Sequence, residues 1–148
     1  MRAITVRQPW AWQIINQGKN IENRTRNIAG KYRGPVAIHA GLQPDQYALA
    51  RLPRRAPEWV TAPRIFDYGV ILGVVDLIDV HRACACCAPW GEPGIAYVEP
   101  GERAPHPISH LVLANPRPIP IHKQPRCRGA LGLWTPPADI VARVEAFV

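Results

Sequence analysis

Short stretches of alternating apolar and polar residues predict a protein built mainly of strands. In residues 3–7, Ile4 and Val6 point one way and the polar residues point the other, which is typical of a half-buried strand. Residues 69–80 are apolar on both faces over most of their length, as expected for the central strand of a closed barrel. Further strands are predicted at residues 21–24, 36–40, 108–114 and 130–134.

Apolar residues at helical spacing predict short helices between these strands. The first covers residues 9–17 and ends before Gly18, because glycine readily adopts the left-handed conformation that closes a helix. A second helix is predicted at residues 44–51. A third follows Thr135, whose hydroxyl is suited to cap a helix that has Pro136 at its first position.

Two stretches rich in proline separate the predicted elements. Residues 52–64 are basic, and residues 83–107 are rich in cysteine, proline and glycine, so we expect mostly loops there. Five or six strands with two or three short flanking helices predict an α+β fold, a small mixed β-barrel. The length predicts a single domain over residues 1–148.

Composition and charge narrow the class of partner. A chain of 148 residues can bury a core without a metal or a disulfide, and 17 prolines disfavour a bundle of long helices. There are 18 Lys and Arg residues against 11 Asp and Glu residues, and the net charge of +7 favours an anionic partner, nucleic acid first. A basic protein that is merely soluble is the alternative.

The chain has no stretch approaching the ~20 apolar residues of a membrane span. The first ten residues contain no apolar run of signal-peptide length. We therefore expect a cytoplasmic protein that has no membrane partner.

Three motifs in a fixed order resemble a known family. Residues 4–11 read ITVRQPWA, residues 18–25 read GKNIENRT, and residues 32–40 read YRGPVAIHA. Together with the apolar strand at 69–80 and the GALGLW segment at 129–134, they resemble the ASCH domain family. The most specific element is Gly18-Lys19 followed by Glu22 and Arg24, with QPWA before it and RGP after it.

The resemblance implies a PUA-like β-barrel, a fold shared with domains that modify RNA or read modified bases. It also implies binding of RNA or DNA in a cleft lined by the three motifs. Some small members of the family are hydrolases. One type removes the acetyl group from N4-acetylcytidine, and ribonuclease activity is also attributed to the family.

Lys19, Glu22 and Arg24 form the centre of the expected site. Glu22 and Arg24 are two residues apart on a predicted strand, so their side chains share one face. The three groups can hold a phosphate and a base edge, through the arginine fork, the lysine charge and the carboxylate. Alternatively, a desolvated Lys19 loses its proton and acts as nucleophile or base. The plain alternative is a surface ion pair.

Other residues of the motifs extend this site. Trp10 can stack on an unpaired base, and core packing beneath the helix is the alternative. Gln8 lies at the same strand-to-helix junction. Arg33 is expected to contact a phosphate or to fix a turn, and His39 faces the cleft or is hydrogen-bonded within the structure.

Two acidic residues could work with Lys19 in catalysis. Asp76 lies in an apolar strand, so it needs a cationic or N–H partner, and Lys19 and Arg24 are the expected ones. It is then either a general acid or base or part of a structural ion pair. Glu22 departs from the amidohydrolase type, in which a threonine matches this position. A carboxylate there would keep Lys19 charged.

The cysteines leave several readings open. Cys84 and Cys87 have the spacing of half a zinc site, which His81, His106, His110 or Cys127 could complete. A redox dithiol is a second reading. We expect ordinary reduced thiols at Cys84, Cys86, Cys87 and Cys127, with no bound metal and no cofactor.

Basic residues also crowd two loop regions. Arg51, Arg54, Arg55 and Arg64 lie near Trp59, Phe66 and Tyr68, and Lys123, Arg126 and Arg128 form a second group. The first group is typical of a rim that follows single-stranded nucleic acid, and a solvated loop is the alternative.

We expect a nucleic-acid-binding domain that recognises RNA or single-stranded DNA, with a modified base as one candidate ligand. The alternative is a small hydrolase of RNA or of a modified nucleoside, in which Lys19 works with Glu22 or Asp76. A protein-interaction module is the third reading.

Overall fold

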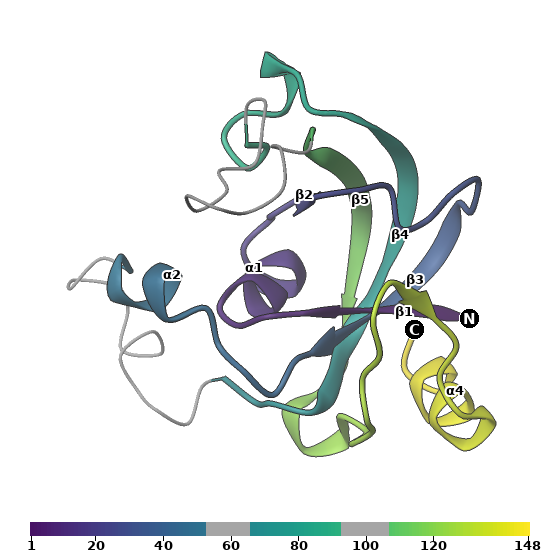
Figure 1. Ribbon diagram of the computed structural model, residues 1–148. Helices are drawn as coiled ribbons and strands as arrows, with labels where there is room; N and C mark the ends of the chain where they lie inside the picture. The colour runs from purple at the N-terminus through teal and green to yellow at the C-terminus, as the bar shows by residue number, and fades with distance from the viewer. Residues whose placement is uncertain (53–65, 93–106) are drawn as a thin grey trace.

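The computed structural model describes residues 1–52, 66–92 and 107–148, and these residues form a curled six-stranded sheet (Figure 1). The strands are β1 (Arg2–Val6), β2 (Ile21–Arg24), β3 (Gly34–Ala40), β4 (Val70–Arg82), β5 (Ser109–Pro118) and β6 (Leu133–Trp134). Their order in the sheet is β2-β5-β4-β3-β1-β6, so β2 and β6 are the edges. Only the β1–β3 pair is parallel among these strands. This is the predicted mixed α+β fold, with a curled, barrel-like sheet.

Three α-helices lie within the described residues: α1 (Trp10–Asn16), α2 (Gln46–Ala50) and α4 (Ala138–Glu145). The sheet curls around α1, whereas α4 lies on the other side of the sheet (Figure 1). Two short 3-10 helices, η1 (Ala85–Cys87) and η2 (Ile121–Lys123), complete the regular structure. In the described part of the chain, no helix is long and apolar enough to cross a membrane.

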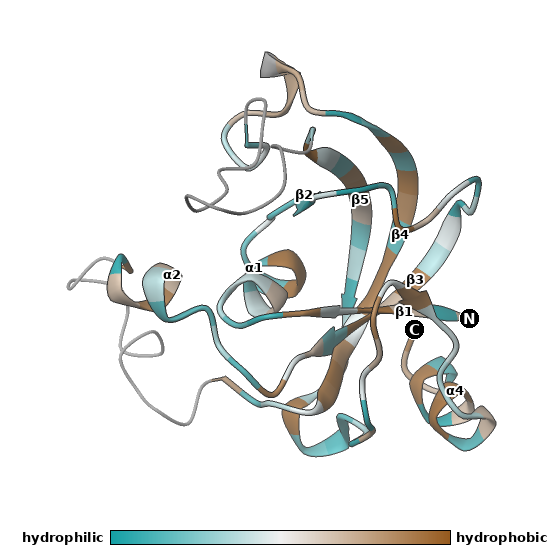
Figure 2. Cartoon of the chain, viewed as in Figure 1, coloured by the Kyte–Doolittle hydropathy of each residue, from teal (hydrophilic) through white to brown (hydrophobic). Residues whose placement is uncertain are grey.

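The strand β4 is apolar on both faces because each face meets a separate core. Val75 and Leu77 pack in the larger core with Ile14 of α1, and Ile71 packs in the smaller core with Val144 of α4. Figure 2 shows the apolar residues of α1 and β4 in the interior of the curl. A central strand buried on both sides was predicted, and it is confirmed here.

The ends of several elements differ from the prediction. The last helix begins after Pro137, and Thr135 does not cap it; the Thr135 hydroxyl instead accepts a hydrogen bond from Arg2 at 2.8 Å. The predicted strand 130–134 is reduced to Leu133–Trp134, because pairing with β1 covers only two residues. Gly18 has the expected left-handed backbone, with φ of 68°, just beyond α1.

Candidate functional site

A cleft of about 1040 Å³ opens at one end of the sheet, between the end of β1, the start of α1 and β2. We call it the Lys19 cleft. Its charged lining residues are Arg7, Lys19, Glu22, Arg24, Asp45, Glu92 and Arg128. This volume is at the upper end of the roughly 300–1,000 Å³ that is typical of small-molecule sites. The cleft is large enough for one nucleotide of a longer strand.

Lys19 lies at the bottom of the cleft with 4% of its surface exposed. Its ammonium group donates to the carbonyl of Ile21 and lies 3.9 Å from the carboxylate of Glu22. The ring centroids of Trp10 and Trp90 are 5.5 and 5.8 Å from the same nitrogen. Such contacts with the faces of aromatic rings partly replace the lost hydration of the cation.

Burial lowers the pKa of Lys19, and the nearby carboxylate of Glu22 only partly offsets this effect. From the sequence, two opposite effects on Lys19 are expected: desolvation favours its neutral form, and the charge of Glu22 favours its charged form. Desolvation acts in the opposite direction and is the larger influence here. A neutral Lys19 is therefore easier to reach than its charged neighbour suggests.

Glu22 and Arg24 form an ion pair on the face of β2 that lines the cleft, as the two-residue spacing predicted. An oxygen of Glu22 lies 3.0 Å from Nη2 of Arg24, and the same nitrogen donates to the carbonyl of Thr5 at 2.7 Å. The Nε of Arg24 is buried and has no hydrogen-bond partner within the described residues. Arg24 thus orients the Glu22 carboxylate and joins β2 to β1 across the cleft.

Trp10 is held by Asp45, which lies just before α2. The indole N–H of Trp10 donates to one Asp45 oxygen at 3.0 Å, and the other oxygen accepts from the backbone N–H of Ala48 at 2.9 Å. These hydrogen bonds, with that to Ala48 the largest influence, lower the pKa of Asp45. The Trp10 ring is therefore fixed in the lining of the cleft rather than in the core alone.

Trp90 is a lining residue that the sequence did not single out. The Asn23 side chain of β2 donates to the carbonyl of Trp90 at 2.9 Å and accepts from the N–H of Glu92 at 3.1 Å. These two bonds hold segment 90–92 beside the cleft. The segment lies in a stretch expected to be loop, and a lone tryptophan between Pro89 and Gly91 was the only available signal.

The remaining predicted binding residues are placed differently. His39 lines the cleft but is 1% exposed, and its Nε2 lies 3.1 Å from the carbonyl of Cys127, so both of its predicted readings apply. Gln8 is fully buried: it donates to the Asp67 carbonyl and accepts from the Trp12 N–H. Arg33 is exposed outside the cleft, 3.5 Å from Asp79.

Asp76 pairs with Arg117, so the expected partners Lys19 and Arg24 are wrong. Two nitrogens of Arg117 lie 2.7 and 3.2 Å from its carboxylate, and Asn115 donates to it at 2.9 Å. Asn115 and Arg117 both lie on β5, and the pairing of β5 with β4 brings them to Asp76. These bonds lower the pKa of Asp76, and the residue does not line the Lys19 cleft.

The basic groups are only partly within the described residues. Arg128 lines the cleft, whereas the Arg126 side chain donates to the Tyr68 carbonyl at 3.5 Å. Arg51 lies 3.7 Å over the ring of Tyr47. The other predicted residues of the first basic group and of the cysteine-rich stretch lie outside the described residues: Arg54, Arg55, Trp59, Arg64 and His106.

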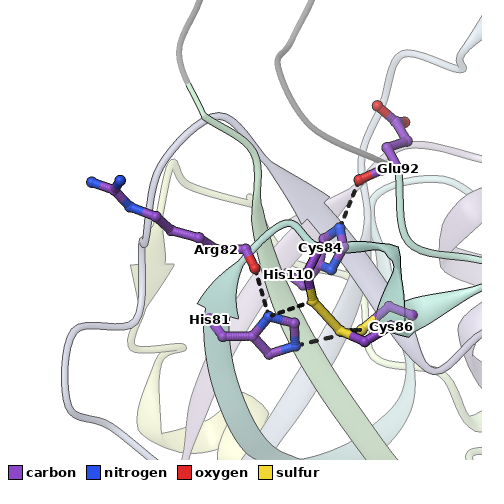
Figure 3. The surroundings of a disulfide bond; sticks show 7 residues. His81, Arg82, Cys84, Cys86, Glu92 and His110 are labelled. Carbon is purple, nitrogen blue, oxygen red and sulfur yellow. Dashed lines mark hydrogen bonds between the residues drawn. A yellow bond between two sulfur atoms is a disulfide. The ribbon is translucent and has the colours of Figure 1, made fainter.

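The cysteines are not all reduced, which corrects the expectation of ordinary thiols. Cys84 and Cys86 form a disulfide (Figure 3). Cys87 and Cys127 are free. The short turn at η1 brings the first two sulfurs together, with Cα atoms 5.3 Å apart. Cys127 lies elsewhere, in the smaller core, where burial raises the pKa of its thiol.

Comparison with known proteins supports the fold. No family model matches the sequence, and no curated protein matches it. The crystal structure of ASCH from Zymomonas mobilis matches with a TM-score of 0.51 and 11% sequence identity. The match covers 98% of this chain and 93% of that chain, so the two share one fold over nearly their whole length. The resemblance to ASCH domains is thereby confirmed at the level of the fold.

Proposed function

We propose that the Lys19 cleft binds single-stranded RNA and holds one of its bases against Trp10 and Trp90. The observation that carries the proposal is the cluster of two tryptophan rings around the buried Lys19, beside the oriented carboxylate of Glu22. Stacking of a base on an aromatic side chain contributes about 1–3 kcal/mol. Unpaired bases are the part of RNA that proteins read in this way.

The charged residues of the cleft contact different parts of the RNA in this proposal. Arg7 and Arg128 are exposed at the cleft and are suited to phosphates. Glu22 accepts hydrogen bonds only, so it favours a base edge with an exocyclic amine, as on cytosine or adenine. Lys19 is too deeply buried to act mainly on a phosphate, and it contributes a donor at the bottom of the cleft.

The test is a titration of fluorescently labelled short RNA and DNA of one sequence, at about 50 and about 200 mM salt. We expect salt-dependent binding, with RNA bound more tightly than DNA. Trp90→Ala should weaken binding about tenfold or more, as expected for a lost stacking contact. Arg128→Ala should lower the salt slope by about one unit. Arg143→Ala, an exposed arginine on α4, is the matched control and should change nothing.

Equal effects of Arg128→Ala and Arg143→Ala would contradict a binding site in the cleft. If DNA binds more tightly than RNA, the cleft remains the proposed binding site, but its ligand is DNA and not RNA. Absence of binding at the lower salt concentration would overturn the proposal and favour a protein-interaction module.

A hydrolase is the second candidate, and the lowered pKa of Lys19 is the observation that favours it. In that case Lys19, with Glu22 beside it, acts on RNA or on an acylated nucleoside. The bound samples are therefore also analysed for strand cleavage and for deacetylation of N4-acetylcytidine. If Lys19→Met abolishes turnover while binding persists, the protein is an enzyme. If the substrates stay intact, the hydrolase is excluded and only the binding proposal remains.

A further inference from the structure

A cluster of histidine and cysteine side chains lies behind segment 90–92, outside the Lys19 cleft. His81 of β4 and His110 of β5 are paired across the sheet, and their ring centroids are 5.3 Å apart. Cys87, at the end of η1, is close to both rings. One ligand atom from each of these three residues lies within 4.8 Å of the other two.

Each of the two rings uses one nitrogen in a hydrogen bond to a backbone carbonyl, which leaves the other nitrogen as an acceptor. Nδ1 of His81 lies 2.7 Å from the Arg82 carbonyl, and Nε2 of His110 lies 2.9 Å from the Glu92 carbonyl (Figure 3). A carbonyl only accepts, so each of these nitrogens carries the proton. The opposite nitrogens, Nε2 of His81 and Nδ1 of His110, are therefore acceptors.

Both of these acceptor nitrogens lie near Cys87. Nε2 of His81 lies 3.4 Å from Sγ of Cys87. His110 is fully buried, and its Nδ1 has no hydrogen-bond partner among the described residues. A buried ring that donates one N–H to a backbone carbonyl and presents the other nitrogen unpaired is typical of a metal ligand. If His110 were buried without binding a ligand, its Nδ1 would lack a hydrogen-bond partner, which costs free energy.

We propose that this cluster binds a zinc ion through Nε2 of His81, Sγ of Cys87 and Nδ1 of His110. Nitrogen and sulfur donors in this combination favour zinc, which takes four ligands in a tetrahedron. The fourth is a sulfur of the Cys84–Cys86 pair, since Sγ of Cys86 lies 3.5 Å from Sγ of Cys87. We call this set the His81–Cys87–His110 site.

The disulfide must be reduced before it supplies the fourth ligand. A dithiol reductant delivers two electrons and two protons to the S–S bond of Cys84 and Cys86, and its own two sulfurs become a disulfide. The released thiol that binds the metal, like Cys87, loses its proton to solvent on coordination. With the disulfide intact, the protein offers three ligands, so zinc binds more weakly.

The site would fix one side of the Lys19 cleft. Trp90 and Glu92 follow Cys87 within five residues, and the Glu92 carbonyl is the acceptor that orients His110. Gly91 packs so closely that a Cβ there would overlap Cys87 and the His110 ring. Metal binding is nevertheless independent of nucleic acid, so the two proposals fail separately.

The test is a titration of the full chain with Zn²⁺ and with Co²⁺, after treatment with a chelator and a dithiol reductant. We expect one ion per chain. Bound Co²⁺ should show thiolate charge-transfer bands and the intense d–d bands of tetrahedral geometry. Cys87→Ser should weaken zinc binding about 100-fold or more, because losing a ligand costs more than the roughly tenfold to hundredfold loss that follows when a hydrogen-bond partner of a ligand is removed. Cys127→Ser, the other free cysteine, is the matched control and should bind like the wild type.

The fourth ligand is identified by Cys84→Ser and Cys86→Ser, one of which should change the Co²⁺ spectrum as Cys87→Ser does. His81→Gln is a further ligand variant in a residue that is not fully buried, so it avoids a folding defect expected of changes at His110. Zinc binding that is equal in the wild type, Cys87→Ser and His81→Gln would overturn the site. Octahedral Co²⁺ spectra without thiolate bands would overturn it as well.

Discussion

Two ion pairs of the same chemistry lie in different regions of the molecule. Glu22 and Arg24 pair inside the Lys19 cleft, and Asp76 and Arg117 pair outside it, between β4 and β5. The outer pair has the better geometry, with two Arg117 nitrogens and Asn115 all on one carboxylate. The inner pair shares its carboxylate with a buried lysine and leaves Arg24 Nε without a partner in the described chain.

On the proposed function, the more complete pair, Asp76 with Arg117, has a structural role, and the less complete pair belongs to the binding site. Asp76 has its hydrogen-bonding capacity largely taken by its own neighbours, so it gains little from a ligand. Glu22 lies in a cleft beside a lysine of lowered pKa, where an incoming donor can complete the arrangement. Binding sites commonly retain such incompletely satisfied groups at some cost in stability.

The largest expected effect concerns binding. Glu22→Gln should weaken RNA binding about tenfold to a hundredfold, because a carboxylate that contacts a base edge contributes about 1–3 kcal/mol. Asp76→Asn is the matched control and should leave the affinity unchanged. The measurement is the same fluorescence titration. If both variants bind alike, the contrast between the two pairs has no functional meaning.

The second effect concerns stability in acid. Hydrogen bonds from Arg117 and Asn115 lower the folded-state pKa of Asp76, so its contribution is full above the ordinary pKa of about 3.9. It is lost as the pH falls through the lowered folded-state value. Asp76→Asn should reduce the free energy of unfolding by about 1 kcal/mol at pH 7, and the difference should shrink in acid. Urea unfolding at several pH values measures it; a constant difference would count against the pair.

The third effect concerns Lys19 in the cleft and its influence on stability at alkaline pH. Because the pKa of Lys19 is lowered in the folded state, the unfolded chain binds more protons, and stability relative to Lys19→Met should rise from pH 7 toward pH 10. One proton changes the free energy by at most about 1.4 kcal/mol per pH unit. Paired urea titrations of both proteins give the slope. A slope of the opposite sign would mean that Glu22 outweighs burial.

The smallest effect extends the comparison to a third pair. Arg33 and Asp79 are 3.5 Å apart and exposed. Arg33→Ala should change the free energy of unfolding by less than about 0.5 kcal/mol, since solvent screens such pairs. RNA affinity should stay the same, because the residue lies outside the cleft. A clear loss of affinity would instead support the phosphate contact expected from its motif.

Local patterns in the sequence were enough to predict most of the fold. Strict alternation identified β1, β2 was placed with its observed bounds, and Gly18 marked the end of α1. The shared face of Glu22 and Arg24 also followed from the two-residue period of a strand. These features depend on residues that are close together in the chain, so no knowledge of long-range pairing was needed.

The structural features that the sequence did not predict depend on contacts between residues that are far apart in the chain. Arg117 became the partner of Asp76 through the register of β4 against β5, which no local pattern contains. Trp90 reached the cleft because Asn23, on another strand, binds its backbone. The sequence left both a desolvated and a charge-paired Lys19 open, and only the burial of Lys19 beside two tryptophans decides in favour of a lowered pKa.

The order of strands in the sheet has a consequence for how the protein is made. β1, the first strand of the chain, lies between β3 and β6, and β6 comes near the end of the chain. During synthesis from the N-terminus, β1 can therefore pair with β3 early but must wait for β6. Gly129 and Leu131, just before β6, also line the cleft. The lining of the Lys19 cleft is consequently completed only after residues 129–132 have been synthesised.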